Sequence, residues 1–253
     1  MVFLSRLATA CFIVALPVFL ITANVRFLAG EERLYERGFR KYDADKVTGL
    51  PLTELDRAAA EIIDYFEDEA ATLRIRVTRA GEEEALFNQR EVEHMVDVKR
   101  VMRFVFRLNE ASLAFVLTYV AGVFLWARSG SMRRLAKEVL AAIALMAALA
   151  AAVGALALIG FEALWERFHE IVFTNDLWQL NARTDRLIQM FPEEFWQEMT
   201  LFLVAMTAVE VVVLVAAAVA YLVFGRAKPS GPEPIKVRPV KPEPIATSSS
   251  TGV

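Results

Sequence analysis

The sequence predicts an all-α membrane protein, in which a bundle of four transmembrane helices carries a small mixed α/β cap outside the cytoplasm. Three observations support this fold class. The chain of 253 residues is 56% hydrophobic, and its mean hydropathy of +0.40 is high for a soluble domain. Its apolar residues gather in four stretches, each close to the roughly 20 helical residues that span a bilayer core. The charged residues gather between these stretches.

The four predicted transmembrane helices divide the chain into eight segments. The first three apolar stretches, residues 7–25, 111–127 and 139–161, contain no charged residue, and the fourth, residues 199–224, contains only Glu210. Because an intramembrane carboxylate is costly, we expect Glu210 to be protonated or hydrogen-bonded, with Thr118 or Tyr119 as candidate partners. An alternative interpretation of the first stretch is a signal peptide cleaved before Asn24, although the stretch is longer than a typical signal-peptide core. The predicted segments are helix 1 (1–25), a cap segment (26–110), helix 2 (111–127), a cytoplasmic loop (128–138), helix 3 (139–161), a second cap segment (162–198), helix 4 (199–224) and a disordered tail (225–253).

The distribution of basic residues predicts the orientation of the chain. The short link between helices 2 and 3 carries four basic residues and one acid. Short loops rich in Lys and Arg stay in the cytoplasm, and the tail is basic as well, so both termini are expected in the cytoplasm of a multi-pass cell-membrane protein. Six of the nine prolines lie in the tail, a composition typical of disorder.

Periodic patterns predict secondary structure in the two cap segments. Apolar residues at helical spacing between positions 52 and 66 predict an amphipathic helix. Alternation from Leu73 to Thr78 predicts a half-buried strand, with residues 80–84 as its turn and 85–87 as a short return strand. From Asn88 onward the pattern predicts one amphipathic helix that continues into helix 2. The second cap segment is rich in aromatic residues, which predicts a compact cap closed by aromatic rings.

Composition excludes several classes of function. A net charge of −3 and a pI near 5.6 argue against a nucleic-acid binder, which usually shows a basic surface. The single cysteine, Cys11, allows no intramolecular disulfide, and inside an apolar run it is typical of a small buried hydrophobe. The segment "HEIVF" lacks the second histidine of an HExxH metalloprotease. We therefore expect neither a metal nor another cofactor, although a zinc site formed by His94, His169 and a nearby aspartate remains an alternative.

The chain has only two histidines, and both fall in the predicted outer segments. His94 precedes helix 2 and His169 follows helix 3, so the topology predicts that both imidazoles lie on one face of the membrane. Asp97 is three residues after His94 and shares its helix face, which suits a carboxylate that fixes the tautomer of a general base, or equally a surface ion pair. The residues expected around His169 are Phe168, Phe173, Asn175, Asp176 and Trp178.

Two histidines without a nearby nucleophile favour acid–base chemistry. A serine triad lacks its GxSxG motif, and Cys11 would lie near the other end of the bundle. The remaining mechanism is one in which the substrate supplies the nucleophile, one imidazole removes a proton, and the other stabilises an oxyanion or protonates a leaving group. The location limits the substrate to a lipid or a lipid-modified molecule at the outer leaflet.

The histidine segments "FNQREVEHMVDVK" and "FHEIVFTNDLWQLNARTDRLIQMFPEEFW" resemble those of the lipoprotein intramolecular transacylases, known as Lit, a family of bacterial four-helix membrane proteins. The resemblance implies two catalytic histidines, here His94 and His169, at the junction of cap and membrane. It implies that an acyl chain moves from the glyceryl sn-2 oxygen of a diacylglyceryl lipoprotein to the amine of its N-terminal cysteine. The expected partners are this lipid-modified protein substrate and the bacterial membrane, with no nucleic acid.

Two other functions remain open from the sequence. One is a non-catalytic membrane protein whose cap binds a lipid or a protein partner, and the other is a metal-dependent hydrolase at the same histidines. Between the two imidazoles, Asp97 favours His94 as the base. The sequence does not predict an oligomeric state or a preference for particular acyl chains.

Overall fold

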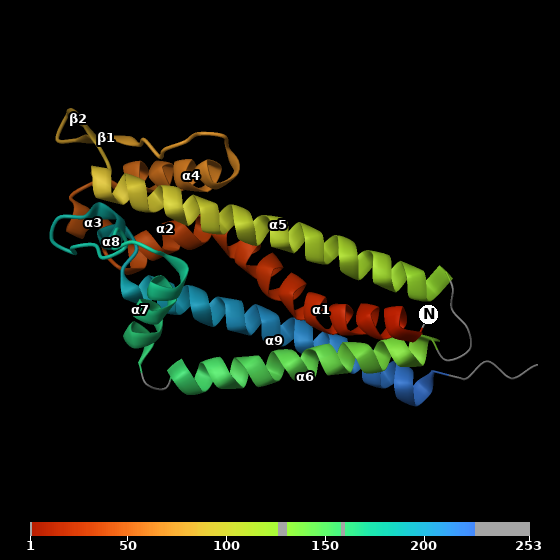
Figure 1. Cartoon of the computed structure of the whole chain (residues 1–253). Helices are drawn as coiled ribbons and strands as arrows, with labels where there is room; N and C mark the ends of the chain where they lie inside the picture. The colour runs from red at the N-terminus through yellow and green to blue at the C-terminus, as the bar shows by residue number, and fades with distance from the viewer. Residues whose placement is uncertain (1, 126–130, 158–159, 226–253) are drawn as a thin grey trace, which may run out of the picture.

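Four long helices lie side by side in the computed structural model, which describes residues 2–125, 131–157 and 160–225 (Figure 1). They are α1 (Val2–Gly30), α5 (Gln89–Leu125), α6 (Ser131–Ala157) and α9 (Glu193–Phe224). All four are long and apolar enough to cross a membrane, judged by length and composition. The helix α1 contacts each of the other three.

The four-helix bundle buries a small cluster of side chains, and its outer surface is apolar. Its buried cluster joins Phe12 and Leu16 of α1 to Val116 of α5 and Met146 of α6. The outward faces expose large apolar side chains, among them Leu117, Phe124, Leu201, Val204 and Val212, each at least 59% exposed. In water such faces would be strongly unfavourable, whereas hydrocarbon solvates them, as expected for a membrane bundle.

Polar side chains inside the bundle are paired. Asn24 of α1 is 3% exposed and donates from Nδ2 to Thr207 and to the Glu210 carboxylate, each at 3.0 Å. The expected partners of Glu210 were therefore wrong, since Thr118 bonds to the carbonyl of Ala114 and Tyr119 bonds to another carboxylate. The physical reason is helix packing, because α9 presents Glu210 to α1.

A compact unit, which we call the cap, lies at one end of the bundle, on the left in Figure 1. It contains α2 (Glu32–Lys41), α3 (Ala44–Thr48), α4 (Leu52–Glu67), α7 (Phe161–Val172), α8 (Arg186–Met190) and the strands β1 (Arg76–Arg79) and β2 (Glu82–Ala85). The charged first part of α5, residues 89–110, belongs to the same end and precedes the apolar part of that helix.

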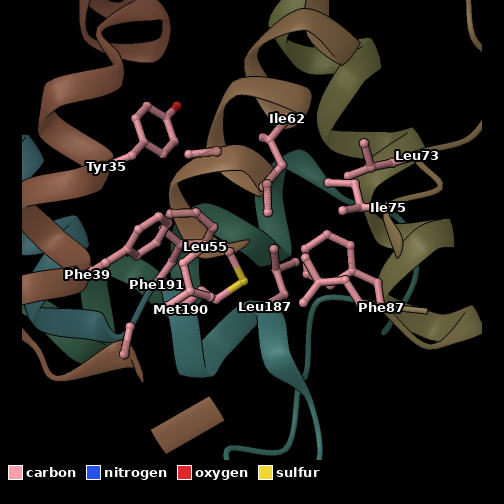
Figure 2. Close-up of a cluster of buried hydrophobic side chains, with 14 of the residues drawn as sticks. Tyr35, Phe39, Leu55, Ile62, Leu73, Ile75, Phe87, Leu187, Met190 and Phe191 are labelled. Atoms are coloured by element: carbon pink, nitrogen blue, oxygen red, sulfur yellow. The ribbon is translucent and has the colours of Figure 1, made fainter. Parts of the chain in front are cut away.

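Both cap segments share one hydrophobic core, shown in Figure 2. Leu55 of α4 and Met190 of α8 are each fully buried in it, although they come from opposite halves of the chain. Further members from the first segment are Tyr35, Phe39, Ile62, Leu73, Ile75 and Phe87, and further members from the second are Leu187 and Phe191. Because the core is continuous, the cap folds as one unit and fixes α5 relative to the chain around α8.

The hairpin differs in register from the expected one. The strands pair antiparallel, with Arg76 opposite Ala85 and Arg79 opposite Glu82. The turn consists of Ala80 and Gly81, with φ of 51° and 88°. A two-residue hairpin loop requires such positive φ values at its two central positions. The acidic residues expected in the turn therefore lie in β2.

Some helix boundaries differ from the expected segments. The helix predicted to run from Asn88 into the second apolar stretch is confirmed as α5. The third long helix begins at Ser131, inside the expected 128–138 loop, because basic residues with good helix propensity extend it. It ends by Ala157, and Phe161 instead starts α7 after Gly160, whose φ is 136°. The predicted disordered tail, apart from Gly225, lies outside the described residues.

Candidate active site

A capping box fixes the start of α5 and thereby the position of His94. Asn88 Oδ1 accepts from the backbone N–H of Glu91 at 3.1 Å, and Glu91 Oε2 accepts from the backbone N–H of Asn88 at 2.8 Å. This reciprocal pair satisfies two N–H groups at the start of the helix that would otherwise lack partners. His94 follows Glu91 by three residues, so it lies on the same helix face, close to one turn further along.

The same two residues connect α5 to the second cap segment. The other Glu91 oxygen, Oε1, accepts from the backbone N–H of Leu187 at 2.6 Å. Asn88 Nδ2 donates to Asp185 Oδ1 at 3.0 Å. Glu91 is 1% exposed, and this burial raises the pKa of its carboxyl although the backbone N–H donors lower it. Glu91 therefore joins the helix of His94 to the segment that follows His169.

His169 lies near the end of α7, where the helix determines its tautomer. Its Nδ1 lies 2.8 Å from the backbone carbonyl oxygen of Trp165, one turn earlier. A carbonyl oxygen only accepts, so Nδ1 carries the proton and Nε2 of the neutral ring carries the lone pair. The ring is thus held as a proton acceptor at Nε2.

The two imidazoles meet at the junction of cap and bundle. Their ring centroids are 6.3 Å apart and their planes differ by 33°. His94 is 6% exposed and His169 is 8% exposed. The buried Nδ1 of His94 has no hydrogen-bond partner within the part of the chain that the structure describes. A buried N–H without an acceptor is unfavourable, which favours the tautomer of His94 that carries its proton at Nε2.

Aromatic rings enclose His169. Its ring centroid lies 4.6 Å from that of Trp165 and 5.0 Å from that of Trp178. Phe168 meets it edge to face at 5.2 Å, and Phe173 lies 5.6 Å from His169 and 5.2 Å from His94. Phe173 thus touches both imidazoles. These rings exclude water from one side of the pair and leave few polar neighbours.

Burial lowers the pKa of both histidines. Burial is the largest cause for His94, the neighbouring His169 and Arg90 act in the same direction, and the opposing charge of Asp97 is smaller, so that the pKa falls to about 4. Burial also lowers the pKa of His169, partly offset by its bond to the Trp165 carbonyl. Both rings are therefore neutral at pH 7, the state in which an imidazole accepts or shares a proton.

Of the supporting residues expected from the sequence, Phe168 and Trp178 lie beside His169, whereas the polar ones have different contacts from those predicted. Asp97 makes no hydrogen bond to His94 within the described residues; it accepts from Arg100 and, at 2.8 Å, from Asn175 Nδ2. Asp97 therefore joins α5 to the loop that follows Phe173. The backbone carbonyl of Asp176 accepts from Arg90, and the Asp176 side chain is exposed. The contacts of Asn175 and Asp176 connect the loop to α5 and do not involve the imidazoles.

Two aromatic residues belong to the site that the sequence did not single out. Trp196 stacks on Trp165 at 5.1 Å between centroids and donates its indole N–H to the carbonyl of Phe191 at 3.2 Å. The stack connects the ring behind His169 to the start of α9. The high aromatic content of residues 161–196 is the feature of the sequence that could have indicated this stack.

The described residues offer few metal ligands around His94 and His169. Across the described residues, no group of three or more His, Cys, Asp or Glu is arranged to hold a metal ion. A zinc site usually has at least three protein ligands, so the alternative with His94 and His169 as ligands lacks a third. The arrangement instead offers one nitrogen lone pair and one N–H donor in a water-poor setting.

Three comparisons relate the chain to known proteins. A model of the family described as "Lipoprotein intramolecular transacylase Lit" matches residues 10–196. The membrane-integral lipoprotein intramolecular transacylase Lit from Bacillus cereus has a similar structure, with a TM-score of 0.69 and 18% identity over 89% of this chain and 98% of that one. A variant of the same protein with one histidine replaced by arginine gives a TM-score of 0.68, at 17% identity over 88% of this chain and 93% of that one.

A curated relative is more similar in sequence over a shorter range. An uncharacterized protein from Aquifex aeolicus (strain VF5) is 33% identical over 116 residues, which cover 46% of this chain. The match spans about half of that relative, 49% of its length. At the identities found, the likeness to the solved structures concerns the fold, which is that of a membrane-integral protein.

Proposed function

Because the chain belongs to the lipoprotein intramolecular transacylase Lit family, we propose that it is a membrane acyltransferase that acts on a lipid-modified protein. The acyl chain moves within a diacylglyceryl lipoprotein, from the glyceryl sn-2 oxygen to the amine of the N-terminal cysteine. The single observation that supports this chemistry is the pair of buried neutral imidazoles, with centroids 6.3 Å apart. No cofactor is assigned to the reaction.

The two tautomers suggest complementary roles. His169, with its proton held at Nδ1 by the Trp165 carbonyl, is the general base at Nε2. His94, whose buried Nδ1 has no partner among the described residues, presents an Nε2–H donor. We assign the base to His169 and not to His94, because Asp97 bonds to Arg100 and Asn175. General bases and hydrogen-bond donors of this kind accelerate acyl transfer together.

The step balances without an enzyme nucleophile. The cysteine amine nitrogen attacks the carbonyl carbon of the sn-2 ester, and His94 donates a hydrogen bond to the resulting oxyanion. His169 removes one proton from the nitrogen as the N–C bond forms. The C–O bond to glycerol then breaks, and His169 returns the proton to the departing sn-2 oxygen. The products are an N-acylated cysteine and a free sn-2 hydroxyl, with no net change in protons.

The aromatic enclosure is suited to a lipid substrate. Phe168 is 42% exposed and Ile171, further along α7, is 82% exposed, so an apolar face adjoins the histidines. We propose that this face contacts the acyl chains of the substrate. The exclusion of water keeps the rings neutral and disfavours hydrolysis of the ester in place of transfer.

We place the chain in a bacterial cell membrane, with the cap outside and both termini in the cytoplasm. The cap then comprises residues 26–110 and 162–198. The supporting observation is charge, since Arg133, Arg134 and Lys137 lie at the end of the bundle opposite the cap, and such residues favour the cytoplasmic side. A reporter fused to either terminus is predicted to be inaccessible to externally added protease.

Co-production with a reporter lipoprotein tests the function. Mass spectrometry of the N-terminal peptide from a host without its own N-acylating enzyme is predicted to find an N-acylated cysteine with one remaining glyceryl acyl chain. An unmodified diacylglyceryl terminus would support the binding protein instead. Loss of product on chelation would support the metal-dependent hydrolase.

A further inference from the structure

We propose that the end of the bundle opposite the histidines holds a second lipid site, which binds the phosphate of an anionic phospholipid. A cavity of about 490 Å³ lies between α1, α5 and α6. Figure 1 shows these three helices together at the right-hand end, away from the cap. The polar residues that line the cavity are Ser5, Thr118, Tyr119, Ser131, Arg134 and Glu138.

A buried carboxylate organises the cavity. Glu138 has a side chain that is 7% exposed, and its two oxygens accept from Thr9 at 3.0 Å, Tyr119 at 2.8 Å and Arg134 Nε at 2.7 Å. Three donors on three helices satisfy the carboxylate, so Glu138 has little capacity to bind a ligand. Its function in the cavity is to hold the guanidinium of Arg134 in one orientation.

One nitrogen of Arg134 forms no hydrogen bond to any residue that the structure describes. Its Nε bonds to Glu138, and its Nη2 donates to Ser5 at 3.1 Å and to Thr9. Counting only described residues, Nη1 has no hydrogen-bond partner, and the side chain is 55% exposed. A guanidinium held at one edge and open at the other is suited to a phosphate oxygen, because its planar donors match phosphate geometry.

The surrounding charge favours an anion over a neutral headgroup. Arg6, Arg133 and Lys137 are exposed at the same end of the bundle, while the carboxylate of Glu138 is already neutralised by Arg134. Basic pockets between transmembrane helices recognise anionic lipid headgroups. A lipid is favoured over a soluble anion because the rest of the cavity is apolar, with Ala8, Gly122 and Val123 in its lining.

The apolar surface beside the cavity provides space for acyl chains. Leu117 and Phe124 of α5 are 60% and 61% exposed, and Leu4 and Leu7 of α1 are 68% and 51% exposed. A phospholipid with its phosphate at Arg134 would lay its chains along these faces. The site is separate from the histidine pair and does not depend on the proposed reaction.

Native mass spectrometry of the full chain in a mild detergent tests the proposal. The protein is titrated with phosphatidylglycerol and with phosphatidylcholine of the same acyl chains. Phosphatidylglycerol is predicted to bind about tenfold more tightly, a difference typical of one charge-assisted hydrogen bond. Arg134→Gln is predicted to remove this preference. The matched control is Arg133→Gln, because Arg133 is exposed on the same turn and, among the described residues, donates only to the carbonyl of Gly225, at 3.4 Å.

A second variant covers the case in which loss of Arg134 disrupts folding around Glu138. Ala8→Leu reduces the cavity and leaves the ion pair of Arg134 and Glu138 in place, and it is predicted to weaken phosphatidylglycerol binding several-fold. Wild-type affinity in Ala8→Leu, or an equal loss in Arg133→Gln, would overturn the proposal, as would equal binding of the two lipids. Displacement of the lipid by excess inorganic phosphate would assign the site to a soluble anion and would also overturn it.

Discussion

The Nδ1–H of His169 donates to the backbone carbonyl of Trp165, 2.8 Å away and one turn earlier in α7. This bond determines which nitrogen of His169 is free to accept a proton. The ring of His94 lies 6.3 Å away, centroid to centroid, and its buried Nδ1 has no such partner in the part of the chain that the structure describes. The two histidines are therefore unequal, and their substitution is expected to have unequal effects.

Replacement of each histidine separates the two roles. His94→Ala and His169→Ala are both predicted to reduce product formation by about 10³-fold or more, as is usual for a lost acid–base or oxyanion group. His94→Gln keeps an N–H donor close to the position of Nε2 and is predicted to retain measurable activity. His169→Gln supplies no base and is predicted to be inactive. Initial rates in proteoliposomes measure this difference, and the opposite order would reverse the assignment.

Stability is predicted to fall in acid because of His94. Its folded-state pKa of about 4 lies below the ordinary histidine value of 6.5, so the unfolded chain binds the proton first as pH falls. The contribution is fully present above pH 6.5 and is lost between pH 6.5 and 4, by about 3 kcal/mol at most. The burial of His169 acts in the same direction.

Thermal unfolding in detergent at pH 7 and pH 4.5 measures this effect. Carboxylates elsewhere also titrate in this range, so the wild type is compared with His94→Gln. The groups nearest His94 are His169, Arg90 and Asp97, and all three are unchanged in the variant. The fall in melting temperature from pH 7 to pH 4.5 is predicted to be smaller in His94→Gln than in the wild type. An equal fall in the two proteins would contradict the assignment to His94.

Glu91 is predicted to be a positioning residue. Glu91→Ala removes the capping box and leaves the backbone N–H of Leu187 without its acceptor, a loss of about 2–4 kcal/mol in the free energy of unfolding. Glu91→Gln keeps one side-chain oxygen and is predicted to lose less. Glu93, two residues away, is bonded only to Gln89 among the residues that the structure describes, and it provides the control as Glu93→Gln. Wild-type stability in Glu91→Ala would show that the contact is unimportant.

Asp97→Asn distinguishes two accounts of this carboxylate. If Asp97 only connects α5 to the loop through Asn175, the amide oxygen of the variant preserves that bond and the rate changes less than about threefold, as for a conservative surface change. If Asp97 orients His94, a much larger loss is expected. The reaction rate at saturating substrate, measured as a function of pH, decides between the two accounts of Asp97.

Glu210→Gln is predicted to leave activity close to that of the wild type. The glutamine oxygen still accepts from Asn24, which currently donates to the carboxylate at 3.0 Å, and the neutral side chain is less costly inside a bilayer. Expression and melting temperature are expected to stay equal or to rise slightly. An inactive but well-folded variant would assign Glu210 a part in the reaction.

The sequence predicted the long helices well because each requires only a run of apolar residues. It also indicated the histidine pair, since the positions of Lys and Arg predict which loops lie on the same face of the membrane. The break at Gly160 was missed because the third apolar stretch of the sequence continues through this glycine to Phe161. The partner of Glu210 was missed because rotation of α9 about its axis depends on packing, which hydropathy does not encode.

The site was less predictable than the fold. Asn88 and Glu91 have the spacing of a capping box directly before a helix, so that signal was present and unused. The partners of Asp97 depend on where the loop after Phe173 crosses α5, a contact between distant parts of the chain. The stack of Trp196 on Trp165 likewise follows from the shared cap core, and sequence spacing alone could not reveal it.

The most direct test of the central claim follows one acyl chain. A synthetic diacylated lipopeptide, with an isotopic label only in its sn-2 acyl chain, is mixed with an unlabelled lipopeptide of different peptide mass and incubated with the purified protein in liposomes. Tandem mass spectrometry is predicted to find the labelled chain on the cysteine nitrogen of the same peptide, and His169→Ala is predicted to leave it on the glycerol. Label released as free fatty acid, transferred to the other peptide, or moved equally well by His169→Ala would contradict the account.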